Sequence, residues 1–68
     1  MYANFETYQF EAAHGRKPRG KGFWFFKVEG TVNFETSAYG TYAEAKKQVK
    51  DEIRSLNSKA IVTVYVLS

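Results

Sequence analysis

The chain has no cysteine, and its 68 residues include only one proline and one histidine. Without cysteine there can be no disulfide bond and no zinc site built from thiolates, which are common ways to stabilise a domain this small. The single histidine, His14, has no second histidine with which to share a metal ion. We therefore expect a domain stabilised by packing or self-association, with no metal site and no cofactor.

Long hydrophobic runs are also missing. The longest apolar stretches, Phe23–Phe26 and Ala60–Leu67, are far shorter than the roughly 20 residues that a membrane-spanning helix needs. The first residues carry Glu6 rather than the basic segment of a secretion signal. These absences predict a cytoplasmic protein that is neither inserted into a membrane nor secreted.

A catalytic pattern is missing too. The serines and threonines have no partner base at a recognisable spacing, and Gly15, Gly20 and Gly22 do not precede a capped helix as the glycines of a phosphate-binding loop do. His14 is expected to be a polar loop residue or a phosphate contact. The sequence therefore favours a binding protein without catalytic residues over an enzyme.

What the chain does contain is a basic loop directly before four consecutive aromatic residues. Five of the chain's ten lysines and arginines lie in His14–Lys27, with the sequence HGRKPRGKGFWFFK, and this segment contains no acidic residue. The net charge of the whole chain is only +3. Clustered cations attract phosphates, and the neighbouring rings offer flat faces to bases or an apolar surface to a protein. The alternative is that these charges only keep a surface loop soluble.

A single domain, residues 1–68, is expected because no repeat, low-complexity tract or long linker divides the chain. Partial alternation over Tyr2–Ala13 predicts a first strand. The glycines and proline of Gly15–Gly22 predict a mobile hairpin loop, followed by a second strand over Phe23–Glu29. Gly30 then makes a tight turn into a third strand, Thr31–Ser37.

A helix is indicated by the capping box of Thr41 and Glu44, which follows a break at Gly40. Apolar residues then recur at three- and four-residue intervals on one side: Tyr42, Ala45, Val49, Ile53 and Leu56. This spacing predicts a helix whose apolar stripe faces the core. The neighbouring flank carries Lys46, Lys47, Lys50 and Arg54. These cations are either a solvated helix face or, if they join the basic loop, part of one larger cationic surface.

The segment Ala60–Leu67 predicts a last strand because its β-branched residues favour a pleated surface. Both of its sides are apolar, which indicates a central strand, or an edge strand whose outer face meets a partner. The predicted order is β-β-β-α-β. The predicted fold is α+β, with an antiparallel sheet of three or four strands and one helix packed on one face.

One helix covers only one face of such a sheet. The face expected beneath the helix carries Trp24, Phe26, Val28, Phe34, Val62, Val64 and Val66. The reverse face then exposes Phe23, Phe25 and Tyr65 with Lys27 and Thr63 beside the basic loop, and dense exposed aromatics mark a contact surface. In the alternative, the N-terminal segment folds over this face and buries Phe23 and Phe25.

Two functions fit an exposed aromatic face. In the first, rings stack on unpaired bases while cations neutralise phosphates, with a nucleic-acid site formed by Arg16, Lys17, Arg19, Lys21, Phe23, Phe25, Lys27 and Tyr65. In the second, the aromatics pack against another protein or a second copy of the chain. The size and composition suit a small phage- or plasmid-encoded regulator or inhibitor, including one that occupies the nucleic-acid site of an acidic or nucleic-acid-binding host protein.

The stretch Gly20–Ile53 also resembles a known type of domain. A basic turn, the strand GKGFWFFKVEG, another strand and then YGTYAEAKKQVKDEI are similar in order to the three-stranded-sheet-plus-helix DNA-binding domain of plant ethylene-response factors and of phage integrase arm-binding domains. In those domains the sheet lies in the major groove. The resemblance therefore implies DNA contacts from Arg19, Lys21, Phe23, Phe25 and Lys27.

Overall fold

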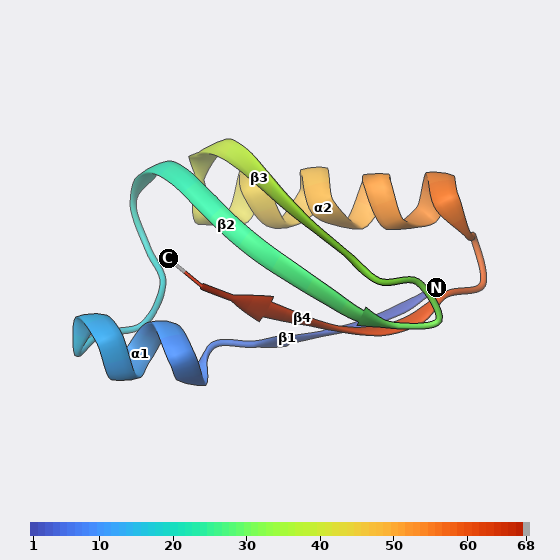
Figure 1. Cartoon of the computed structure of the whole chain (residues 1–68). Helices are drawn as coiled ribbons and strands as arrows, with labels where there is room; N and C mark the ends of the chain where they lie inside the picture. Colours follow the sequence, from blue (N-terminus) through green and yellow to red (C-terminus); the bar gives the residue numbers. More distant parts are fainter. Residues whose placement is uncertain (68) are drawn as a thin grey trace.

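A computed structural model describes residues 1–67 and consists of a four-stranded sheet with two helices (Figure 1). In chain order the elements are β1 (Tyr2–Glu6), α1 (Tyr8–His14), β2 (Lys21–Gly30), β3 (Phe34–Thr41), α2 (Tyr42–Leu56) and β4 (Ile61–Val66). The predicted α+β class is confirmed. The sheet is mixed rather than antiparallel, and the second helix, α1, was not expected from the sequence.

The strands lie in the order β1-β4-β2-β3. The long strand β2 is antiparallel to both β3 and β4, whereas β1 runs parallel to β4 and pairs Tyr2 with Ile61. Because β4 has a neighbour on each side, it is the central strand that its apolar sequence allowed. The parallel pairing of the first and last strands is the feature that the predicted antiparallel sheet lacked.

The segment after Glu6 is where the predicted first strand was wrong. Instead of extending to Ala13, the chain forms α1, in which Phe10 is the only buried residue. Gly15 ends this helix with φ +68°, and its N–H donates to the carbonyl of Glu11 at 2.8 Å. A left-handed residue of this kind after the last turn is a frequent helix ending.

The basic loop is consequently not a hairpin loop. It connects α1 to β2, and β4 separates β1 from β2 in the sheet. Lys21 and Gly22, which were assigned to the loop, begin β2 and pair with Thr41 and Gly40. From here on, "basic loop" refers to residues 15–20.

The hairpin β2–β3 contains the predicted turn at Gly30, although β3 starts later than expected. Gly30 has φ +144°, and the Asn33 side chain both donates to its carbonyl and accepts from its N–H, at 3.2 and 3.3 Å. A Cβ atom on Gly30 would collide with the Ile61 carbonyl and would lie 2.9 Å from Cα of Val62. Glycine is therefore required here for both conformation and space.

The end of β3 lies at Thr41 rather than at Ser37, where the sequence had predicted it. Trp24 on β2 pairs with Ala38, and its indole N–H donates to the Gly40 carbonyl at 3.2 Å. Ala38 lies opposite Trp24 in the ladder, and a Cβ atom on Gly40 would lie 3.3 Å from the side chain of Glu44. Ala38 and Gly40 look like strand-breaking positions in the sequence, but they extend the strand beneath Trp24.

The predicted helix and its capping box are confirmed in α2. Thr41 Oγ1 accepts the backbone N–H of Glu44 at 3.2 Å, and Glu44 Oε1 accepts the backbone N–H of Thr41 at 3.0 Å. Of the predicted stripe, Ala45, Val49 and Ile53 are buried. Tyr42 is half-buried and packs against the core, whereas Leu56, the last helical residue, is 60% exposed, so only the end of the stripe lies outside the core.

The two faces of the sheet differ largely as predicted, although Phe34, which was expected in the core, and Tyr65, which was expected to be exposed, are both half-buried. Helix α2 lies over one face (Figure 1), and the buried side chains there include Trp24, Phe26, Val28, Val62, Val64 and Val66. On the other face, called the open face below, Phe23 is 67% and Phe25 46% exposed. The alternative in which the N-terminal segment covers these rings is therefore wrong, because that segment instead forms the edge strand β1 and the helix α1.

Candidate nucleic-acid interface

Two exposed rings lie side by side on the open face, near the start of β2. Phe23 pairs with Tyr39 across the β2–β3 ladder, and their ring centroids are 4.9 Å apart at an interplanar angle of 64°. Tyr39 is 55% exposed. Tyr39 lies beyond Ser37, the predicted end of the third strand, and was therefore not among the predicted site residues. The alternation of exposed residues, which continues through Glu35, Ser37 and Tyr39, could have indicated that the strand extends to Tyr39.

A cation lies directly beside this ring pair. The ammonium nitrogen of Lys21 is 5.9 Å from the centroid of the Tyr39 ring. Lys17 and Arg19 of the basic loop are exposed, and Arg16 donates from Nη1 to the carbonyl of Arg19 at 3.4 Å. The structure therefore groups flat apolar faces and positive charge at one end of the molecule.

A row of aromatic contacts connects the basic loop to α2 on the covered side. The guanidinium of Arg16 lies 5.7 Å from the Phe10 ring centroid, Phe10 and Trp24 are 5.3 Å apart, and Trp24 and Tyr42 are 5.1 Å apart. The ammonium group of Lys46 is 5.2 Å from the Tyr42 ring. Because Phe10 and Trp24 are buried, this row runs through the core, with the Arg16 guanidinium at one end and the Lys46 ammonium group at the other.

The hydrogen bond at the start of α2 strengthens this connection. The backbone N–H of Tyr42 donates to the carbonyl of Gly20, the last residue of the basic loop, at 3.2 Å. Burial raises the pKa of the Tyr42 hydroxyl, so this ring stays neutral among the cations. Further along α2, the ammonium groups of Lys46 and Lys50 lie 5.2 and 5.6 Å from the ring of Phe5 on β1.

The middle of the open face has a different character. The ammonium group of Lys27 is 3.5 Å from a carboxylate oxygen of Glu29, and its cross-strand neighbours are Glu35 and Tyr65. By strand alternation Glu6, the partner of Tyr65 in the β1–β4 ladder, also belongs to this face. The charge of Lys27 is thus balanced by nearby carboxylates.

The eight predicted site residues therefore separate into two groups. Lys21, Phe23 and Phe25 lie on β2 at the end that the basic loop enters, and the loop itself carries Arg16, Lys17 and Arg19. Lys27 and Tyr65 lie further along the sheet, where carboxylates surround them. The first group combines charge and exposed rings, whereas the second does not.

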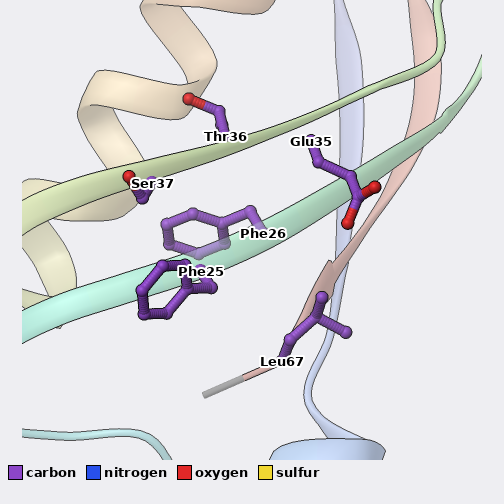
Figure 2. Close-up of a pocket in the computed structure, with 6 residues that line it drawn as sticks. All are labelled: Phe25, Phe26, Glu35, Thr36, Ser37 and Leu67. Atoms are coloured by element: carbon purple, nitrogen blue, oxygen red, sulfur yellow. The ribbon is translucent and has the colours of Figure 1, made fainter.

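A shallow hollow of about 540 Å³ lies beside Phe25, the last residue of the first group along β2. Figure 2 shows Phe25 from β2, Glu35 and Ser37 from β3, and Leu67, which follows β4, around it. The N–H of Leu67 donates to the Phe25 carbonyl at 2.9 Å, which fixes the end of the chain beside β2. The apolar side chains of Phe25 and Leu67 and the carboxylate of Glu35 therefore line the same hollow.

Across residues 1–67, no group of three or more histidine, aspartate and glutamate side chains gathers as a metal ion would require. None of the helices in the same part of the chain is both long and apolar enough to cross a membrane. No family model, curated protein or solved structure matches this sequence. Functional inference consequently rests on the geometry of the open face and of the basic surface.

Proposed function

We propose that this chain is a small non-enzymatic protein that binds nucleic acid through the basic loop and the aromatic end of its open sheet face. The observation that carries the proposal is the exposed pair Phe23 and Tyr39, with Lys21 beside Tyr39 and the basic loop leading into the same strand. Exposed rings next to cations match the two parts of a nucleotide, a flat base and a charged phosphate.

Stacking is the interaction that the rings supply. A base that stacks on an aromatic side chain gains about 1 to 3 kcal/mol, with little dependence on sequence. Phe23 and Phe25 project from the same side of β2 and, as alternate residues of a strand, lie about 7 Å apart along it. They are therefore spaced to meet different bases, and unpaired bases are the form of nucleic acid that exposes such faces.

The cations supply the rest of the affinity. Arg16, Lys17, Arg19 and Lys21 lie in or next to the loop that enters β2, and the α2 flank offers a separate group of cations, Lys46, Lys47, Lys50 and Arg54. Neutralising phosphates releases counterions, so the logarithm of the affinity falls by about 0.7 for each contacted phosphate of a single strand per tenfold rise in salt. Strong salt dependence is thus an expected property of the complex.

The direct test is a titration of dye-labelled single-stranded DNA, single-stranded RNA and duplex DNA, followed by fluorescence anisotropy at low and at physiological salt. The dye is placed on the oligonucleotide because Trp24, the only tryptophan, is buried and would report a contact poorly. Single strands should bind, and binding should weaken steeply as salt rises. Absence of binding at low salt to all three probes would refute the proposal.

Single-charge variants localise the site. Lys21→Gln should weaken binding several-fold and flatten the salt dependence, because Lys21 lies beside Tyr39. Lys59→Gln is the matched control, since Lys59 is an exposed lysine in the turn before β4, at the sheet end where Gly30 pairs with Val62. Equal losses in both variants would mean that only net charge matters.

A protein partner is the second candidate, and a specific observation favours it. Glu6, Glu29 and Glu35 share the open face, where they would repel a polyanion that crossed the whole sheet. In this proposal the rings pack against a second copy or against another protein, including a host protein whose nucleic-acid site the chain would occupy and inhibit. It predicts a mass that rises with concentration, or a stoichiometric complex that survives moderate salt.

A further inference from the structure

Glu35 is the carboxylate that a simple phosphate-binding surface does not explain. It lies on β3 only two residues from Ser37, the cross-strand neighbour of Phe25. Its cross-strand neighbour Lys27 forms its ion pair with Glu29 instead. Among the hydrogen bonds and ion pairs of residues 1–67, none engages the Glu35 side chain. An exposed acceptor group is therefore free beside the aromatic end of the sheet.

The surroundings of Glu35 suit a flat ligand. The hollow is bounded by the Phe25 ring, by Leu67 and by the Ser37 hydroxyl, with Glu35 at its margin (Figure 2). Phe25 is 46% exposed, so part of its ring surface is free for contact. A planar ring that lay against Phe25 would share this hollow with Leu67 and with the Glu35 carboxylate.

The chemistry of base edges decides which base such a site favours. A carboxylate accepts hydrogen bonds at two oxygens and donates none when ionised. Guanine offers two adjacent donors, its N1–H and its N2 amino group, which match the two oxygens. The Watson–Crick edges of adenine and cytosine place one amino donor next to an acceptor nitrogen. Thymine and uracil flank their single N–H with two carbonyl oxygens, which a carboxylate repels.

From this arrangement we propose that the hollow is a base-recognition subsite with a preference for guanine, in which Phe25 supplies the stacking face and Glu35 binds the Watson–Crick edge. The inference rests on the proposed nucleic-acid function and adds base specificity to it. It also gives Glu35 a role in a surface that otherwise binds phosphates, because a carboxylate that meets a base edge does not have to face the backbone.

Glu29 provides a matched comparison on the same sheet face. It carries the same charge as Glu35, but its carboxylate is paired with Lys27 and it does not line the hollow. Removing either charge should raise the affinity for any polyanion slightly. Only the loss of Glu35 should change the preference among bases.

The experiment uses the full chain and dye-labelled thymidine octamers that carry one central guanine, inosine, adenine or cytosine, with the all-thymidine octamer as reference. The guanine probe should bind at least about fivefold more tightly than the reference, the lower end of the range for a bidentate base contact. Inosine lacks the N2 amino group and should lose most of this gain. Glu35→Gln should remove the preference for guanine, and Glu29→Gln should retain it.

The outcomes separate the two proposals. Binding to every probe without base preference, or a guanine preference that Glu35→Gln leaves intact, would overturn the recognition subsite and leave nucleic-acid binding in place. Failure of every probe to bind at low salt would overturn the proposed function and the subsite with it. Circular dichroism of both variants should match that of the unaltered chain, because both glutamates are exposed.

Discussion

The two sides of β2 carry nearly the same kind of residue and have opposite roles. Trp24 and Phe26 point beneath α2 and are 5% and 1% exposed, whereas Phe23 and Phe25 point away from it and are 67% and 46% exposed. Composition therefore does not separate core residues from exposed residues in this strand. What separates them is the placement of the helices, because α2 covers one face, where Phe10 of α1 also packs against Trp24, and the other face remains exposed.

The largest expected change in the free energy of unfolding comes from replacing one phenylalanine on each side of β2 with alanine. Phe26→Ala should lower the free energy of unfolding by about 4 kcal/mol, since it removes a fully buried ring and leaves a cavity. Phe25→Ala should cost less than about 1 kcal/mol, because solvent already reaches its ring. Urea unfolding followed by circular dichroism measures both. Similar losses in the two variants would show that the open face is not open in solution.

A second comparison contrasts the two ends of β2. Gly30→Ala should cost about 2 kcal/mol, because alanine at φ +144° is strained and its Cβ would collide with the backbone of β4. Gly22→Ala is the control, since the space around its Cβ position is empty and its φ is not positive. Thermal melts of both variants measure this difference in stability. A Gly30 variant as stable as the Gly22 variant would mean that the turn adjusts freely.

A smaller loss of stability is expected from a substitution at the start of α2, the helix that covers one face of the sheet. Thr41→Ala removes the oxygen that accepts the N–H of Glu44, and loss of such a cap costs about 1 kcal/mol. Thr36→Val gives a control in the neighbouring part of β3, where the threonine hydroxyl bonds Glu52 at the surface. Chemical denaturation of the two variants should show the larger loss for Thr41.

The smallest expected effect is a change in the pH dependence of the free energy of unfolding. Hydrogen bonds from the backbone and side chain of Thr41 lower the pKa of the Glu44 carboxyl below its usual value. A lowered pKa in the folded state means that the ionised carboxylate contributes stability above the unfolded-state pKa, and that this contribution is lost as the pH falls through the folded-state pKa. Glu44→Gln should therefore reduce the acid sensitivity of unfolding. An unchanged pH profile would contradict a role for this carboxylate in the cap.

The sequence predicted the parts of the fold whose signals are local. The capping box and the spacing of Ala45, Val49 and Ile53 located α2. The alternation in β2 assigned Trp24 and Phe26 to the core, because a strand repeats every two residues and only one face could be covered.

Helix α1 was not predicted from the sequence, and the reason is physical. A seven-residue helix that buries only Phe10 has too few apolar positions to produce a helical period, and Tyr8, Phe10 and Ala12 imitate strand alternation. Gly15 was the informative residue, since a glycine after a short run of helix-forming residues often ends a helix. It was interpreted instead as part of a hairpin loop.

Strand order and the make-up of the site depended on contacts between distant residues. Periodicity tells which way a side chain points, but it does not tell which strand lies next to which, so the position of β1 beside β4 could not be deduced. For the same reason Lys27 was grouped with the free cations. Its pairing with Glu29 and its proximity to Glu35 depend on side-chain placement and on the β2–β3 register.

The pairing of β1 with β4 also bears on how the protein is made. Tyr2 finds its ladder partner in Ile61, at nearly the opposite end of the chain. During synthesis β1 must therefore wait, without its neighbour, until the segment Ile61–Val66 has left the ribosome, whereas β2, β3 and α2 can already associate. Such late long-range closure is slow compared with local steps. The nascent chain would thus expose an unpaired edge of β1 until β4 is in place.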